Sequence, residues 1–160
     1  MAKGAKTIDK DLGQKQIVRE LKKAKGSFVT VGIHAKEHEY ESGASVQMVG
    51  TVHEFGLPEK NIPERSFLRS TYDKNKEFWR KMTVDLFYKV LQRSITVETA
   101  LKQIGILQVS AVQGTLLKGD FAELKTSTIR ARKRGGLNSK RPLVATRKLW
   151  RSINFEVTVK

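Results

Sequence analysis

The stretch around Gly56 and Pro58 constrains the fold of this chain more than any other part of its sequence. Ser45 opens it, and its hydroxyl can accept a hydrogen bond from an unpaired N–H of a first helical turn. Gly56 then supplies the left-handed conformation that commonly ends a helix, and Pro58 prevents the helix from continuing. Between these ends, apolar residues at helical spacing predict a short helix with one apolar face: Val46, Val49, Val52 and Phe55.

The residues after Pro58 predict a loop that leads into a longer helix. Pro63 disfavours the helical conformation before it, so Asn61 and Ile62 are predicted to be extended. Glu64 suits the first turn of the next helix, which carries Phe67 and Leu68 toward the core.

Two long amphipathic helices are predicted, over residues 66–91 and 97–117, with Thr96 as the N-cap of the second. Gly105 and Gly114 weaken the second helix by up to about 1 kcal/mol each relative to alanine. The apolar face of the first comprises Phe67, Tyr72, Phe78, Trp79, Met82, Leu86, Phe87, Val90 and Leu91. The second is predicted to turn inward Val97, Leu101, Ile104, Leu107, Ala111 and Val112.

Strands are expected at residues 27–33 and 153–159, and a short helix at 14–25. The predicted fold class is therefore α+β, a small sheet covered by the two long helices. Two strands are too few for a stable sheet, so a third is expected from the 57–65 loop or from a neighbouring subunit. The whole chain, 1–160, is expected to be one domain with a loose N-terminus over residues 1–13.

Composition limits the environment and the partners. The chain has no cysteine, which excludes disulfides and thiolate metal sites, and it has no apolar run of the roughly 20 residues that span a bilayer. Its N-terminus lacks the apolar region of a secretory signal, so the protein is expected to stay in the cytoplasm. With 31 Lys and Arg against 16 Asp and Glu, a net charge of +15 indicates a polyanionic partner or an acidic protein.

Most of the charge asymmetry lies in residues 125–151, the basic segment, with ten Lys and Arg and no acidic residue. It is predicted to form a helix over 128–134, a glycine-containing break, and a short helix over 145–151. The segment is either a solvated basic arm or loop, or a surface that contacts DNA or an acidic protein ring. The candidate contact residues are Arg130, Arg132, Lys133, Arg134, Lys140, Arg141, Arg147 and Lys148.

Two histidine patterns were weighed as catalytic or metal sites. His34 and His38 fit an H-x-x-E-H pattern with Glu37, but a polar loop rather than a helix is predicted there. His53 and Glu54 lack the serine or aspartate partners of a hydrolytic triad, and are expected to form local hydrogen bonds at a helix end. We therefore expect no enzyme, no metal and no cofactor.

Two motifs resemble a family of tailed-bacteriophage neck, or tail-completion, proteins. The C-terminal motif departs from the family pattern at Arg141, Ala145 and Arg147. The N-terminal motif comprises Val49, Val52, His53, Glu54, Phe55, Gly56, Ile62, Pro63, Arg65, Phe67, Leu68 and Arg69. The C-terminal motif comprises Thr128, Ile129, Arg132, Lys133, Pro142, Leu143, Thr146, Leu149, Ser152 and Ile153.

The resemblance implies a structural virion protein at the head–tail junction. Such a protein would form a sixfold or twelvefold ring around the DNA channel, between the connector or head-closure proteins and the tail proteins, after assembly in the host cytoplasm. Contact with the genomic DNA would be non-specific, and no membrane would be involved. A free basic nucleic-acid-binding protein and another tail ring protein, such as a tail terminator, are the alternatives.

Overall fold

The chain has an α+β fold, as the sequence predicts. The computed structural model describes residues 12–34, 40, 43–137 and 139–160. In chain order these form α1 (Gln14–Ala24), β1 (Phe28–Ile33), α2 (Val46–Phe55), the 3₁₀ helix η1 (Pro58–Lys60), α3 (Arg69–Leu91), α4 (Val97–Lys118), α5 (Thr126–Arg134), α6 (Lys148–Ser152) and β2 (Ile153–Thr158).

The two strands lie near opposite ends of the sequence and pair antiparallel, from Phe28 opposite Thr158 to Ile33 opposite Ile153. Their odd-numbered residues are buried or half-buried, whereas the even-numbered residues are mostly exposed. Because side chains alternate between the two faces of a sheet, one face packs on the protein and the other meets solvent. The alternation predicted for the C-terminal strand is therefore confirmed.

The loop after α2 does not provide a third strand. Leu57 and Ile62 form a bridge with each other, and the N–H of Leu57 donates to the carbonyl of Ile62 at 2.8 Å. The loop thus closes on itself around η1, and Asn61 is left-handed (φ 52°) rather than extended as predicted. Within the described residues the sheet has two strands, and completion by a neighbouring subunit stays a prediction.

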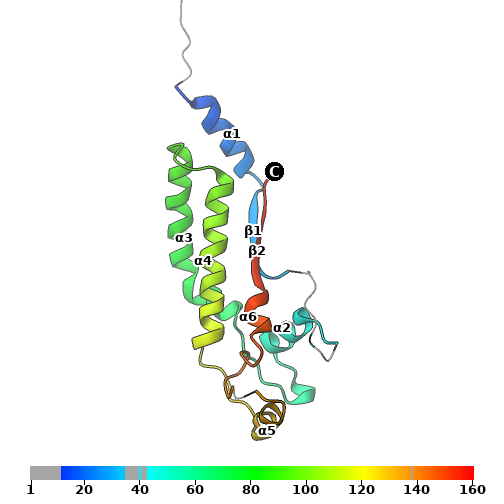
Figure 1. Cartoon of the computed structure of the whole chain (residues 1–160). Coiled ribbons are helices and arrows are strands. Elements are labelled where there is room, and N and C mark those ends of the chain that lie inside the picture. Colours follow the sequence, from blue (N-terminus) through cyan, green and yellow to red (C-terminus); the bar gives the residue numbers. More distant parts are fainter. Residues whose placement is uncertain (1–11, 35–39, 41–42, 138) are drawn as a thin grey trace, which may run out of the picture.

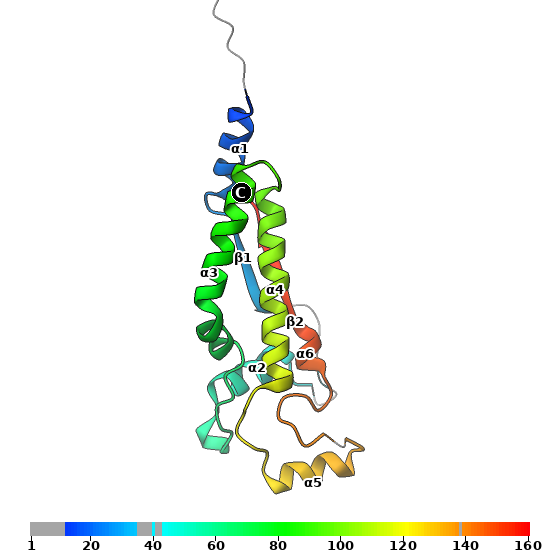
Figure 2. The same cartoon turned by 90° about the vertical axis from the view of Figure 1, so that its left-hand side faces the viewer.

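The long helices α3 and α4 form an antiparallel hairpin beside the two-stranded ribbon (Figures 1 and 2). α4 lies directly on both strands, and a Cβ added at Gly105 would meet the ring of Phe155 on β2. α3 packs on α4, where the hydroxyls of Thr71 and Thr115 lie 2.6 Å apart. Thr96 caps α4 as predicted, since its hydroxyl accepts from the N–H of Thr99.

The apolar core forms two clusters. One lies between α1, α3 and α4 and contains Leu86, Val90, Val97, Ala100 and Ile104. The other joins the α2 region to the C-terminal part of the chain and contains Val46, Phe67, Val112, Leu116, Leu143, Leu149 and Ile153.

Phe67 is fully buried, as predicted, but the apolar faces of the long helices are narrower than predicted. Tyr72, Phe78, Phe87 and Leu107 are exposed, because the neighbouring elements cover only one side of each helix. No helix of the described part is both long and apolar enough to cross a bilayer.

Candidate interaction surface

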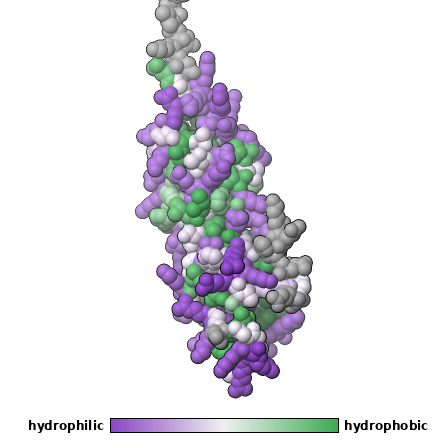
Figure 3. All heavy atoms as spheres, in the orientation of Figure 1, coloured by the Kyte–Doolittle hydropathy of each residue, from purple (hydrophilic) through white to green (hydrophobic). Residues whose placement is uncertain are grey.

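The basic segment gathers at one end of the molecule, beyond the tip of the α3–α4 hairpin where α4 ends (Figure 1). It comprises α5, the residues up to Arg147, and α6, which leads into β2. In the space-filling view this tip is hydrophilic, whereas apolar side chains gather higher up over the hairpin and the strands (Figure 3).

Two of the eight candidate cations hold the segment together. Nη1 of Arg132 donates to the carbonyls of Ser139 (3.2 Å) and Arg141 (2.7 Å). Nη1 of Arg141 donates to the carbonyl of Leu117, the last turn of α4, at 2.6 Å. These guanidinium groups therefore anchor the break between α5 and α6 to the end of α4.

A third cation, Lys148, lies over the ring of Tyr40, with Nζ 5.5 Å from the ring centroid. The other five candidates are exposed, and none of them forms an ion pair with a carboxylate of the described residues. These five are called the exposed cations below: Arg130, Lys133, Arg134, Lys140 and Arg147.

A buried arginine extends this positive region into the interior. Arg65 is 5% exposed, and its Nε and Nη2 donate to the carbonyls of Ala122 (2.8 Å) and Glu123 (3.0 Å). Burial lowers the pKa of Arg65, and so does the charge of Arg132 nearby. Burial, with the charges of Arg65 and Arg132, also lowers the pKa of His53 to about 4. His53 is therefore neutral at pH 7.

The side chain of Glu54 caps the start of α3 from α2. It is 4% exposed, and its carboxylate accepts hydrogen bonds from the N–H groups of Phe67 (2.8 Å), Leu68 (2.9 Å) and Arg69 (2.9 Å). The hydroxyl of Ser66 (2.7 Å) and Nε of Arg69 (3.2 Å) donate to it as well. Burial alone would raise the pKa of Glu54, but these donors together hold it below its ordinary value.

This geometry corrects the prediction of local hydrogen bonds at the end of α2. Glu54 bonds to residues 12 to 15 positions later, and Nδ1 of His53 is buried with no hydrogen-bond partner among the described atoms. α3 consequently begins at Arg69 instead of 66, because the preceding N–H groups turn to the carboxylate. All acceptor capacity of Glu54 is occupied by structural donors, so no proton transfer is assigned to it.

The H-x-x-E-H pattern falls largely on residues 35–39, outside the described residues. His34 is described, and its Nε2 lies 3.0 Å from Oγ1 of Thr30. In the part of the chain that the structure describes, no group of three His, Cys, Asp or Glu side chains is placed to hold a metal ion.

Comparisons with models of protein families, with curated proteins and with solved structures found no match. The functional argument therefore depends on the geometry of this chain and on the two motifs in its sequence.

Sequence reasoning missed the roles of Glu54 and Arg65. Both belong to the N-terminal motif, so their presence was visible, but their partners are 12 to 58 residues away. The available signal was a carboxylate within an apolar helical turn and an arginine beside a buried aromatic. Side chains of this kind are seldom buried unless they are paired.

Proposed function

We propose that this chain is a structural subunit of the head–tail junction of a tailed bacteriophage, a neck or tail-completion protein that forms a ring around the DNA channel. The ring is sixfold or twelvefold, it joins the connector or head-closure proteins to the tail, and it has no catalytic role and no cofactor. It is assembled in the host cytoplasm and becomes part of the virion.

The observation that carries this proposal is that the two motifs pack together. Phe67 of the N-terminal motif shares one buried cluster with Leu143, Leu149 and Ile153 of the C-terminal motif. Most of the polar residues in the N-terminal motif also have architectural roles, since Glu54 caps α3, Arg65 holds residues 122–123, and Arg69 pairs with Glu54 and Glu64. Two separate parts of the sequence thus form one structural unit, which is what a family pattern describes.

The distribution of charge supports a role beside DNA or an acidic protein. The exposed cations lie at one end of the molecule, and a phosphate backbone attracts such a surface without reading sequence. An acidic neighbouring ring would be attracted by the same charges.

A free basic nucleic-acid-binding protein is the second candidate function. The five exposed cations favour it, because a regulator of this kind also needs arginine and lysine side chains that no carboxylate neutralises. The strength and selectivity of DNA binding separate the two functions.

The location of the protein in phage particles tests the proposal. Antibody raised against this chain is expected to label the head–tail junction in negative-stain images of virions. Label at the tail tip, or particles without label, would contradict the proposed function. Particles from which the gene has been deleted provide the control for specific labelling, and they are expected to contain heads and tails that do not join.

A further inference from the structure

A closed ring of identical subunits needs two different surfaces, one on each side of the subunit, that fit one another. Such a head-to-tail contact repeats around an axis until the ring closes. This inference therefore rests on the ring of the proposed function, and asks which surfaces of the subunit form the contact.

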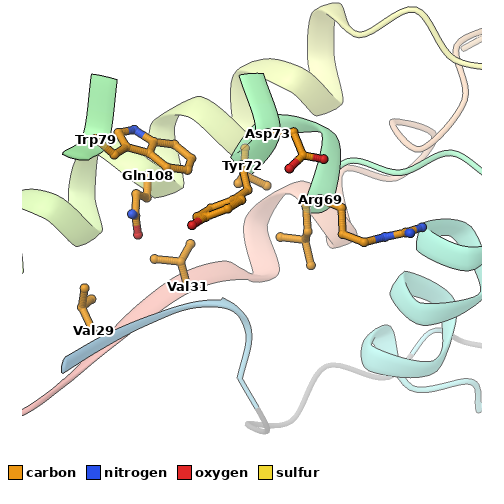
Figure 4. Close-up of a pocket in the computed structure, with 9 residues that line it drawn as sticks. Val29, Val31, Arg69, Tyr72, Asp73, Trp79 and Gln108 are labelled. Carbon is orange, nitrogen blue, oxygen red and sulfur yellow. The ribbon is translucent and has the colours of Figure 1, made fainter. Parts of the chain in front are cut away.

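One side of the molecule has an open apolar groove of about 490 Å³ between α3 and β1. Val29 and Val31 of β1 line it on one side, and Tyr72 and Trp79 of α3 line it on the other (Figure 4). Val112 of α4 is a further lining residue. The ring of Tyr72 is exposed at the groove, and its centroid lies 5.9 Å from that of Trp79.

The other side of the hairpin has an apolar ridge on α4. Thr115 faces α3, since its hydroxyl contacts that of Thr71. Ile106 lies nine residues earlier, which is two and a half turns of an α-helix, so it faces away from α3. Its side chain is 56% exposed. The groove and Ile106 thus lie on opposite sides of the hairpin, whose two helices stand side by side in Figure 2.

The exposed face of α4 is also uncharged. Between Lys102 and Lys118 the sequence has no charged residue, and the exposed residues near Ile106 include Gln103 and Ser110. A Cβ added at Gly114 would meet no atom within 4 Å, so this part of α4 is open to a neighbour.

This neutrality identifies the partner as a second copy of the chain. Copies with a net charge of +15 repel one another, so they approach best where neither surface is charged. DNA and acidic proteins would instead select the basic end. At the groove, the only lining residues with charge are Arg69, which already pairs with Glu54 and Glu64, and Asp73.

We propose that the Ile106 ridge of one copy docks into the Tyr72–Trp79 groove of the next. The contact buries an exposed isoleucine against an exposed aromatic ring and leaves the same two surfaces free at the ends of the pair. It therefore repeats, and the basic segment of every copy points the same way along the ring axis.

Cysteine crosslinking tests the contact directly, because the natural chain has no cysteine. Two single variants are made, Ile106→Cys and Tyr72→Cys, both at exposed positions where the fold is retained. A mixture of the two, oxidised at high protein concentration, is expected to give a disulfide-linked dimer on a non-reducing gel. Neither variant alone is expected to do so. Lys81→Cys, an exposed position on α3, mixed with Tyr72→Cys is the control.

Two results would overturn the proposal. A mixed dimer no more abundant than that of the Lys81→Cys control would show that ridge and groove do not meet. Efficient crosslinking of Ile106→Cys with itself would show a two-fold contact, which cannot repeat around a ring. Crosslinking without virion labelling would refute the neck function but keep the contact, and labelling without crosslinking would place the ring contact on other surfaces.

Discussion

Glu54 is the residue on which the start of α3 depends. α3 has no side-chain cap from its own N-cap residue, Leu68, and the carboxylate of Glu54 takes that role from another helix. The first N–H groups of a helix lack partners within the helix, and a buried N–H without a partner is costly. A negative charge at this position also interacts favourably with the helix dipole.

Replacing Glu54 by alanine is expected to lower the free energy of unfolding by about 3–5 kcal/mol, because it leaves Arg69 and several buried N–H groups without their acceptor. The control is Glu64→Ala, which removes the second carboxylate on Arg69 from an exposed site and is expected to cost at most about 1 kcal/mol. Urea unfolding followed by circular dichroism measures both. Equal losses in the two variants would show that the cap contributes nothing beyond a surface ion pair.

The pH dependence of stability is expected to report on His53. Its pKa is about 4 in the folded chain and near 6.5 when unfolded, so the unfolded state binds the proton first as the pH falls. The stability contributed by His53 is therefore complete above pH 6.5 and is lost between pH 6.5 and 4. Between pH 7 and 5 the loss is about 2 kcal/mol.

His53→Gln removes this titration, so its urea midpoint is expected to change less than that of the parent between pH 7 and 5. An unchanged difference between the two pH values would show that other groups cause the loss. Below about pH 4.5 both proteins are expected to lose stability further, since the pKa of Glu54 is lowered in the folded state and its carboxylate is then protonated.

At the level of the elements, α4 joins the helical hairpin to the sheet, and its two interior glycines have different environments. A Cβ at Gly105 would lie 2.5 Å from a ring carbon of Phe155, whereas a Cβ at Gly114 would meet open space. The same substitution in the same helix therefore separates packing from helix propensity.

Gly105→Ala is expected to destabilise the protein by about 1–3 kcal/mol, because α4 must move away from β2. Gly114→Ala is expected to stabilise it by up to about 1 kcal/mol, through the helix propensity of alanine. Thermal unfolding compares the two variants with the parent. If both substitutions raised the melting temperature, the close contact between α4 and Phe155 would be wrong.

The order and type of the elements could be predicted from the sequence, because each depends on local patterns. The cap at Ser45, the cap at Thr96 and the alternation of Ile153–Thr158 act within a few residues. The exposure of Phe78 could not be predicted, since it depends on which side of α3 meets α4. The engagement of Arg132 and Arg141 depends on carbonyls that folding brings together, so composition alone counted them with the exposed cations.

At the level of the whole molecule, an uncharged helical face and a basic end are separate. The first suits contact between copies of the chain, and the second suits contact with a polyanion. A neck subunit needs only a surface that DNA passes, whereas a free DNA-binding regulator must hold DNA at physiological salt. The two candidate functions therefore differ in how binding responds to salt.

The neck function predicts weak binding that does not depend on sequence and that decreases steeply as salt rises. A protein with several phosphate contacts loses orders of magnitude in affinity between 50 and 200 mM salt, with a slope of about 0.9 per contact. Replacing Arg130, Lys133 and Arg134 together by glutamine is expected to flatten this slope by up to about three contacts. Arg132 is left in place, because its bonds to Ser139 and Arg141 stabilise the segment.

A salt titration with two unrelated duplexes measures these expectations by fluorescence anisotropy. The matched control replaces three exposed lysines of α3 by glutamine, so that it has the same net charge as the triple variant: Lys74, Lys76 and Lys81. If control and triple variant lose the same slope, overall charge rather than the basic end attracts DNA. Tight binding at 150 mM salt that distinguishes the two duplexes would favour a regulator over a neck subunit, because sequence selectivity requires contacts to base edges that a passing channel does not need.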